Sequence, residues 1–281
     1  TFRDRLVFPI YSEADLVGFI GRRNPTKPDS ELSGPKYLNT RGTAAFVKGE
    51  QLFGLTEATA DLALGATPVL VEGPMDAIAV TLAAGGEYVG IAPLGTAFTE
   101  AQAKRLKQYV ANEPDRVVIA TDADSAGWES ARRAFWRLAA LRANPQHLSL
   151  PDGIDPADLL RTEGPEALNR RLERTTEFAS GLVDRLIDER LPGYPDAFSR
   201  VDLARAIARI VGALPPDHWL EAAQDLAERL DLSIATIHEE IYEAGCLWTD
   251  DPTACVTREL AALRPLARPV AQAQRAERPG V

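Results

Sequence analysis

Short apolar runs alternate with stretches of helical pattern between residues 68 and 150, and this alternation restricts the fold more than any other feature of the sequence. The apolar runs are rich in β-branched residues, which is typical of buried strands in parallel sheets. The predicted strands are residues 69–71, 88–92, 116–120 and 147–150, and the predicted helices are residues 75–84, 99–110 and 126–142. Strands that alternate with helices of this length form βαβ units, so we expect an α/β domain with a mainly parallel sheet of about four strands flanked by helices.

Two of the predicted strands end abruptly in carboxylates. Glu72 follows the first strand, and Asp122 and Asp124 follow the third. Ligands bind outside the carboxyl ends of parallel strands, so these side chains should share one edge of the sheet. Asp122 and Asp124 are two residues apart in an extended segment and therefore project to the same side. Because neighbouring carboxylates repel each other unless a cation lies between them, the pattern favours a divalent-metal site and phosphate chemistry.

A third acidic segment follows the fourth predicted strand and contains Asp155 and Asp158. Each acidic residue also has a purely structural interpretation. Asp124 and Asp155 both fit the cap of the helix that follows them, and Asp76 fits the first turn of a helix, where negative charge is favourable. A single Asp-x-Asp pair is a weak signal, but three acidic strand ends in one sheet make coincidental capping the weaker explanation.

The chain divides into four predicted units. Residues 1–60 predict a small α+β subdomain that opens with a hairpin, because two apolar runs bracket the polar turn at residues 12–15. Residues 61–165 hold the α/β domain. Apolar residues recur at spacings of three and four in residues 166–245, as expected for a helical bundle. Residues 246–281 are rich in Pro, Ala and Arg, and we expect a flexible tail there.

The formal charge of −10 is spread unevenly. Residues 166–245 carry nine Lys and Arg against sixteen Asp and Glu, whereas residues 1–60 carry eight against seven. With no general basic surface, contacts with nucleic acid would have to be local. The two cysteines, Cys246 and Cys255, fit neither a zinc site nor a disulfide framework, which favours a reducing, cytoplasmic setting. No apolar window is long enough to cross a membrane, and the start at Thr1 suggests part of a longer protein.

The order of short motifs resembles a known family. Glu72-Gly73 followed by Asp122-x-Asp124, on alternating strands and helices, resembles the TOPRIM fold that bacterial primases, topoisomerases and certain nucleases share. The flanking motifs resemble the DnaG-type bacterial replicative primases, in the family's order: Phe8-Pro9-Ile10, Gly18-Phe19-Ile20-Gly21-Arg22, Pro35-Lys36-Tyr37-Leu38-Asn39-Thr40, Lys48-Gly49-Glu50-Gln51-Leu52-Phe53-Gly54-Leu55, Leu94-Gly95-Thr96 and Leu150-Pro151-Asp152-Gly153-Ile154-Asp155-Pro156. The resemblance covers residues 1 to about 245, and the family's N-terminal zinc-binding part has no counterpart in this sequence.

The resemblance implies a DNA primase, which is a DNA-directed RNA polymerase. Such a nucleotidyltransferase synthesises short RNA primers on single-stranded DNA from ribonucleoside triphosphates during replication. In that family the TOPRIM carboxylates hold two or more Mg²⁺ or Mn²⁺ ions, and the matching residues here are Glu72, Asp122 and Asp124. Asp155 matches the family's later acidic motif. The next carboxylate, Asp158, departs from the family's usual spacing, so which of the two binds metal stays open.

The family's basic groove corresponds to five residues of the N-terminal unit: Arg22, Lys36, Tyr37, Asn39 and Lys48. Guanidinium and ammonium groups neutralise the phosphates of nucleotide or template, and an aromatic ring can stack on a base. Each cation taken alone could equally be a solvated surface charge.

Two other functions remain open from the sequence. A TOPRIM-type nuclease would keep the fold and the metal site but cleave nucleic acid. A non-catalytic docking module would use the acidic residues 166–245 to bind another replication protein. A replicative helicase is a candidate partner of a primase or of such a docking module, and no membrane partner is expected.

Overall fold

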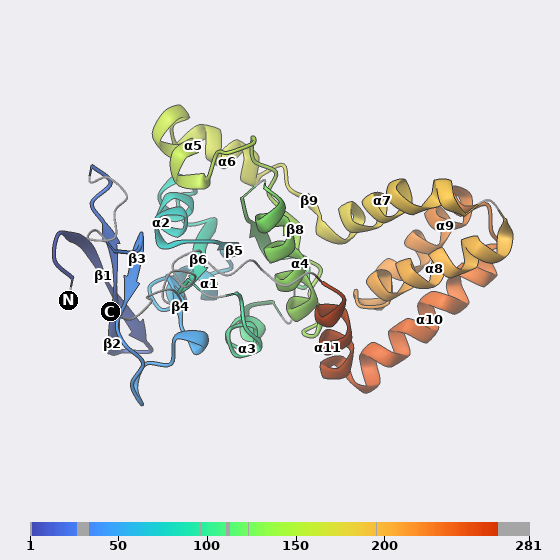
Figure 1. The fold of residues 1–281 in the computed structure, drawn as a ribbon, viewed down its shortest axis with the longest axis horizontal. Coiled ribbons are helices and arrows are strands. Elements are labelled where there is room, and N and C mark those ends of the chain that lie inside the picture. Colours follow the sequence, from blue (N-terminus) through green and yellow to red (C-terminus); the bar gives the residue numbers. More distant parts are fainter. Residues whose placement is uncertain are drawn as a thin grey trace, which may run out of the picture.

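The computed structural model describes residues 2–263 apart from residues 27–33, 96, 111–112, 123 and 195. A small antiparallel sheet, a larger sheet with helices on both faces, and a set of long helices follow one another along the chain (Figure 1). The molecule is elongated, with the small sheet at one end and the long helices at the other (Figure 1). The predicted fold, an α/β domain between a small α+β unit and a helical unit, is confirmed.

The N-terminal sheet consists of β1 (Arg5–Ser12), β2 (Asp15–Arg23) and β3 (Tyr37–Asn39). Both strand pairs are antiparallel, and β1 and β2 form the predicted hairpin. Its turn places Glu13 in the left-handed region, with φ of 56°. The short 3-10 helix η2 (Lys48–Glu50) then leads into the larger sheet. Residues 27–33, between β2 and β3, lie outside the described residues.

The larger sheet has six strands, which in spatial order are β4 (Leu52–Phe53), β6 (Tyr88–Pro93), β5 (Thr67–Val71), β7 (Val118–Ala120), β8 (Gln146–His147) and β9 (Thr176–Glu177). The four central strands are parallel, as predicted, and β4 and β9 add antiparallel edges. Each edge strand is only two residues long, and so short a run has no apolar period that a sequence could display.

Helices cover both faces of this sheet. One face carries α1 (Thr59–Ala63), α3 (Glu100–Val110) and α4 (Ser125–Ala139), and the other carries α2 (Pro74–Ala83), α5 (Pro156–Glu163) and α6 (Pro165–Leu172). In β5, Leu70 packs into the first core, and Val69 and Val71 pack into the second. Burial on both faces explains why the strands appear as continuous apolar runs. Gly90 lets α2 approach β6, because a Cβ atom there would lie 2.1 Å from the carbonyl oxygen of Ala77.

The C-terminal helices are α7 (Phe178–Arg190), α8 (Ala197–Val211), α9 (Trp219–Leu230), α10 (Ile234–Asp250) and α11 (Pro252–Ala262). Their buried residues belong to the same core as those of α3 and α4, so the helical unit is continuous with the sheet. Trp248 of α10 stacks on Trp136 of α4, with 5.8 Å between the ring centres. No helix among the described residues has the length and apolar content needed to cross a membrane.

The prediction of a flexible tail at residues 246–281 is wrong for residues 246–262, which are mostly helical. Helix α10 continues to Asp250, and α11 follows after a single residue. The Asp251 side chain caps α11 and Pro252 occupies its first turn, so a proline that suggested a tail begins a helix instead. Cys255 and Leu263 are buried and tie this segment to the core. Residues 264–281 lie outside the described residues.

Candidate metal and nucleic-acid site

Glu72 and Asp122 lie beside each other at the carboxyl ends of β5 and β7. The chain passes from β5 to β6 on one side and returns to β7 on the other, so the strand order reverses between β5 and β7. Such a switch point is where ligands bind in open parallel sheets. Glu72 Oε1 accepts a hydrogen bond from the backbone N–H of Asp122 at 3.2 Å, across 50 residues of sequence. The predicted convergence of these two strand ends is therefore found.

Asp124 caps the helix that follows β7. Its Oδ1 accepts a hydrogen bond from the backbone N–H of Gly127 at 2.7 Å. A Cβ atom at residue 127 would lie 2.1 Å from the carbonyl oxygen of Asp122, so the glycine allows α4 to begin directly at the strand end. Asp124 remains exposed. Because a carboxylate has two oxygens, capping by one leaves the other available for a ligand. Ala123 lies outside the described residues.

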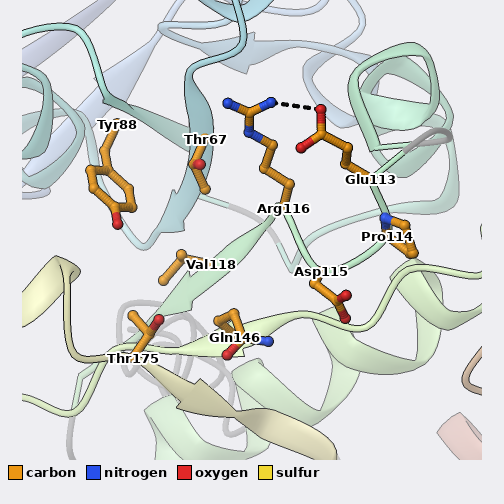
Figure 2. Close-up of a pocket in the computed structure, with 9 residues that line it drawn as sticks. All are labelled: Thr67, Tyr88, Glu113, Pro114, Asp115, Arg116, Val118, Gln146 and Thr175. Carbon is orange, nitrogen blue, oxygen red and sulfur yellow. Dashed lines mark hydrogen bonds and ion pairs between the residues drawn. The ribbon is translucent and has the colours of Figure 1, made fainter. Parts of the chain in front are cut away.

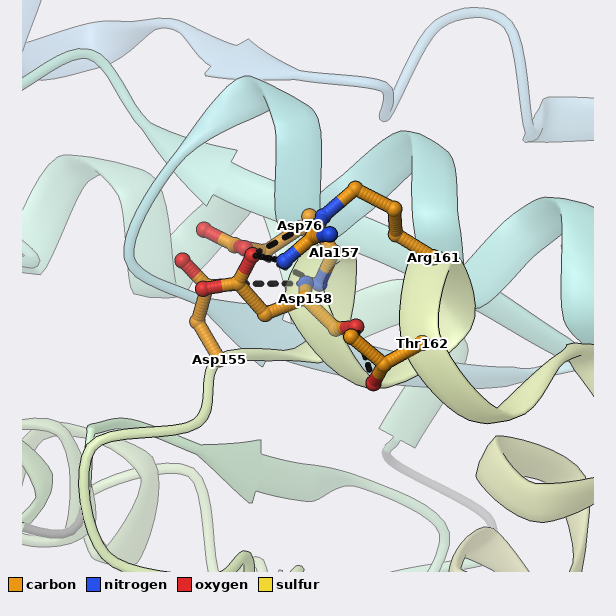
Figure 3. A network of polar contacts seen from close by, with 6 residues as sticks. All are labelled: Asp76, Asp155, Ala157, Asp158, Arg161 and Thr162. Carbon is orange, nitrogen blue, oxygen red and sulfur yellow. Dashed lines mark hydrogen bonds and ion pairs between the residues drawn. The ribbon is translucent and has the colours of Figure 1, made fainter.

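Asp155 and Asp158 stand at the start of α5 and differ in their surroundings (Figure 3). Asp155 is the helix cap, and its Oδ1 accepts a hydrogen bond from the backbone N–H of Asp158 at 2.6 Å. The carboxylate of Asp158 pairs with Arg161 at 3.0 Å. Asp155 raises the pKa of Asp76 and of Asp122, and Asp158 is not among the causes of either shift. The surroundings therefore favour Asp155, and not Asp158, as a neighbour of the other carboxylates.

Asp76, in the first turn of α2, is an acidic neighbour that sequence reasoning assigned only to its helix. Its side chain is 9% exposed. Its Oδ1 accepts a long hydrogen bond, 3.4 Å, from the backbone N–H of Ala157 (Figure 3). Burial, followed by the charges of Asp155 and Asp122, raises the pKa of Asp76 to about 7. The available signal was its position four residues after Glu72, which is one helical turn beyond the strand end.

The carboxylates at this edge disfavour one another's ionisation. Partial burial and the charges of Asp122 and Asp124 raise the pKa of Glu72. Partial burial and the charges of Asp155 and Asp124 raise the pKa of Asp122. Lys36 acts in the opposite direction on both Glu72 and Asp122, which places its ammonium group near the same edge. Like charges held together in this way are unfavourable unless further cations join them.

We call the acidic residues that meet here the carboxylate group: Glu72, Asp76, Asp122, Asp124 and Asp155. Their oxygens are the hard ligands that Mg²⁺ and Mn²⁺ prefer, and the raised pKa values indicate incompletely compensated negative charge. Among the residues that the structure describes, no three Asp, Glu, His or Cys side chains are gathered closely enough to enclose an ion by themselves. An ion at this edge would therefore keep part of its water shell, as Mg²⁺ commonly does.

Arg22 and Tyr37 face this edge from the N-terminal sheet. They are directly paired residues of β2 and β3, and Arg22 Nη1 donates a hydrogen bond to the Tyr37 hydroxyl at 3.1 Å. A Cβ atom at Gly73 would lie 3.7 Å from that hydroxyl oxygen, so Tyr37 lies against the turn that follows Glu72. Burial raises the pKa of Tyr37. Lys36 Nζ is 6.0 Å from the centre of the Tyr37 ring. These three predicted groove residues therefore lie near the carboxylate group.

Asn39 and Lys48 contact the loop after β6. Asn39 Nδ2 donates to the carbonyl oxygen of Leu94 at 3.1 Å, and Lys48 Nζ donates to that of Gly95 at 3.2 Å. Partial burial lowers the pKa of Lys48. Both side chains thus hold the N-terminal unit against the larger sheet, a role that the sequence did not reveal. Their contact with a nucleotide or template stays a prediction. Thr96, the last residue of the motif in this loop, lies outside the described residues.

The opposite edge of the sheet carries a pocket of about 500 Å³ (Figure 2). Its lining includes the first residues of four strands: Thr67, Tyr88, Val118 and Gln146. The pocket lies at the amino ends of these strands, whereas the carboxylate group lies at their carboxyl ends. Arg116, which also lines it, is paired with Glu113 at 2.8 Å. We assign no chemistry to this pocket.

The sequence matches two protein families. Residues 69–160 match the Toprim-like family, and residues 1–59 match the N-terminal domain of the DNA primase catalytic core. The first match includes every member of the carboxylate group. The second includes all five predicted groove residues.

Proteins of similar sequence and structure are DNA primases. The DNA primase of Clostridium acetobutylicum is 35% identical over 216 residues, which are 76% of this chain and 34% of that protein. A DNA primase domain from Pseudomonas aeruginosa superposes with a TM-score of 0.68 at 31% identity, covering 86% of this chain and 73% of that one. A DnaG primase catalytic domain bound to single-stranded DNA has the same TM-score, 0.68, at 30% identity, covering 83% and 71%. This chain spans about one third of the length of the curated relatives it matches.

Proposed function

The chain belongs to the bacterial DnaG-type DNA primases, and we propose that it catalyses the synthesis of short RNA primers on single-stranded DNA. The observation that carries the proposal is the carboxylate group at the switch point of the sheet, with Lys36 close enough to affect the pKa of its members. Negative charge concentrated beside a cation at a ligand-binding edge suits an enzyme that binds divalent ions and phosphates.

We propose that the carboxylate group holds two or more Mg²⁺ or Mn²⁺ ions. Toprim primases generally use divalent metal ions. Bound ions would activate the primer 3′-hydroxyl and stabilise the charge of the leaving pyrophosphate. The contribution of the chain is to hold the ligands in place. The N–H of Asp122 fixes Glu72, helix caps fix Asp124 and Asp155, and burial fixes Asp76.

Lys36 and Arg22 are proposed to bind the triphosphate of the incoming ribonucleotide and the template backbone. Lys36 faces both the carboxylate group and the Tyr37 ring, so a phosphate bound there would lie beside metal ligands and an aromatic surface. Arg22 uses Nη1 for the Tyr37 hydroxyl, and its remaining N–H groups can reach phosphate oxygens. Asn39 and Lys48 would hold the N-terminal unit in position beside the carboxylate group through their bonds to the loop after β6.

A single-stranded DNA template is supported by the related DnaG catalytic domain bound to single-stranded DNA. The acidic helical unit, at residues 166–245, is a candidate surface for a replicative helicase, and a cytoplasmic location is proposed from the two free cysteines.

The decisive assay separates extension from cleavage. The full-length protein is incubated with a labelled single-stranded DNA, ribonucleoside triphosphates and Mg²⁺, and the products are resolved by length. We expect new RNA chains that depend on both the template and the triphosphates. Shortening of the labelled strand would indicate a nuclease instead. If neither product forms and Mn²⁺ titration shows no binding, the chain would be a docking module.

A further inference from the structure

A pocket of about 900 Å³ lies between the turn of the β1–β2 hairpin and the exposed side of α3. The side chains that decide its chemistry are Glu13 of the turn and Lys104, Arg105, Lys107, Gln108 and Tyr109 of α3. Helix α3 buries its other side, including Leu106 and Val110, against the sheet. The pocket is therefore lined by three cations on a rigid helix, in a chain whose formal charge is −10.

Two of these cations have no anionic partner among the described residues. Arg105 donates to the carbonyl oxygen of Glu50 at 3.1 Å and to Gln51 Oε1 at 2.6 Å, and both acceptors are uncharged. Lys107 is exposed and forms no ion pair with a described residue. Many arginines of the helical unit, in contrast, pair with carboxylates, as in Arg185–Glu189, Arg200–Asp231, Arg205–Glu240 and Arg229–Asp184. Positive charge in this pocket is thus available to a ligand.

Lys104 is the partial exception, because it pairs with Glu100 at 2.7 Å. Both side chains are mostly exposed, so the pair is screened by water and can be exchanged for a phosphate at small cost. Glu13 is the acidic side chain among the lining residues. The balance in the pocket therefore remains positive.

The short helix η2 contacts both the α3 pocket and the loop after β6. Lys48, which bonds to the loop after β6, is the first residue of η2, and Arg105 bonds to the carbonyl of Glu50, the last residue of η2. One turn of 3-10 helix thus separates Lys48 from the carbonyl group that Arg105 contacts. Lys107 is two residues further along α3, and side chains at this spacing do not face each other. A strand of phosphates that passes along η2 would meet Lys48 and Arg105 first, and would reach Lys107 after crossing α3.

We propose that the α3 pocket binds the backbone of single-stranded DNA where the template leaves the catalytic edge, an inference that rests on the proposed function. Lys107 and Arg105 would contact phosphates, and Gln108 and Tyr109 would contact sugars or bases. Cations that track the backbone beside an aromatic side chain are the usual features of single-strand binding without sequence preference. The ligand of the pocket is thus a polyanion. The pocket would increase the affinity for the template and would take no part in the catalytic reaction.

Charge reversal at Lys107 tests the proposal directly. Binding of the full chain to a fluorescent oligo-dT and to a mixed-sequence single strand is measured by anisotropy over a series of salt concentrations. Lys107→Glu should weaken binding of both strands by about fivefold or more at low salt, and should lower the slope of log affinity against log salt by about 0.7 per lost phosphate contact. Lys107→Arg, which keeps the charge, should bind like the parent chain.

The matched control is Arg170→Glu, which makes the same change of net charge at an exposed residue of α6, on the other face of the sheet. Equal affinity losses in Lys107→Glu and Arg170→Glu would overturn the proposal, because only net charge would then matter. The proposed function can fail separately. If the parent chain makes no primers but DNA affinity falls in Lys107→Glu and not in Arg170→Glu, the DNA-binding pocket stands and the proposed catalysis is wrong. If the parent chain makes primers but the DNA affinity of Lys107→Glu is unchanged, the proposed catalysis stands and the DNA-binding pocket is wrong.

Discussion

The Oε1 atom of Glu72 accepts a hydrogen bond from the backbone N–H of Asp122 at 3.2 Å, which joins the carboxyl ends of β5 and β7. The bond favours the ionised form of Glu72, whereas partial desolvation and the charges of Asp122 and Asp124 disfavour it and give a net rise in its pKa. The ends of the two strands are thus held together although their carboxylates repel. A divalent ion would relieve that repulsion, so the protein should bind such ions more readily than an ordinary acidic surface does.

Glu72→Gln should separate the structural role of this residue from its charge. The amide oxygen of Gln can still accept the hydrogen bond from Asp122, so the thermal midpoint should change little. The loss of one negative ligand should weaken Mn²⁺ binding by roughly tenfold or more. Calorimetric titration and thermal unfolding on the same sample check both parts. A variant with parental Mn²⁺ affinity would remove Glu72 from the metal site.

Asp76→Asn should stabilise the metal-free protein at neutral pH. The pKa of Asp76 is raised from 3.8 to about 7, so the native state holds this proton more tightly than the unfolded chain does. Stability is therefore lost as the pH rises from about 4 to about 7, and Asn avoids that loss. The gain in unfolding free energy should be larger at pH 8 than at pH 5, by roughly 2 kcal/mol. Urea denaturation in EDTA measures it, and equal gains at both pH values would contradict this explanation.

Binding of Mg²⁺ should tighten as the pH rises from 6 to 8. Ion binding requires ionised carboxylates, and the pKa of Asp76, at about 7, lies within this interval. Each proton that must leave changes the apparent affinity by up to about tenfold per pH unit below its pKa. Calorimetric titration in two buffers of different ionisation enthalpy would detect the released proton. An affinity that does not vary with pH would show that Asp76 does not take part.

Asp155 and Asp158 should differ in importance for primer synthesis. Asn is a good helix cap, so Asp155→Asn keeps α5 intact while removing a charge that faces Asp76 and Asp122. Asp158→Asn removes only an exposed pair with Arg161, worth at most about 1 kcal/mol. We expect a large loss of synthesis in the first variant and near-parental synthesis in the second. The opposite ranking would return the metal role to Asp158.

The arrangement of the carboxylates was predictable because it follows from a local pattern. An apolar β-branched run that ends in an acidic residue shows both the strand and the edge it faces, and this identified Glu72 and Asp122. Asp155 was identified from the acidic segment that follows the fourth predicted strand. Asp76 was not predicted as a member of the site, because an acidic residue in the first turn of a helix is already explained by the helix dipole. Only the fold shows that Asp76 is buried between α2 and the start of α5.

Other features depend on contacts that no local pattern encodes. The bonds of Asn39 and Lys48 to the loop after β6 join segments 55 and 47 residues apart. Helix α11 was missed because its proline fits a loop as well as a first helical turn, and burial of Cys255 and Leu263 decides between the two. The cations of α3 lie in an ordinary amphipathic helix, and their significance depends on the hairpin opposite them.

The most direct test of the account is the rate of primer synthesis by the full-length protein carrying Asp122→Asn, on a single-stranded template with ribonucleoside triphosphates and Mg²⁺. Asn has the same shape and removes one of several repelling charges, so folding should be preserved. The carboxylate of Asp122, at the end of β7, is a proposed metal ligand. Its loss should therefore lower the rate of synthesis by roughly 100-fold or more. Synthesis at the parental rate by a folded Asp122→Asn protein would contradict the central claim that this edge of the sheet is the catalytic site.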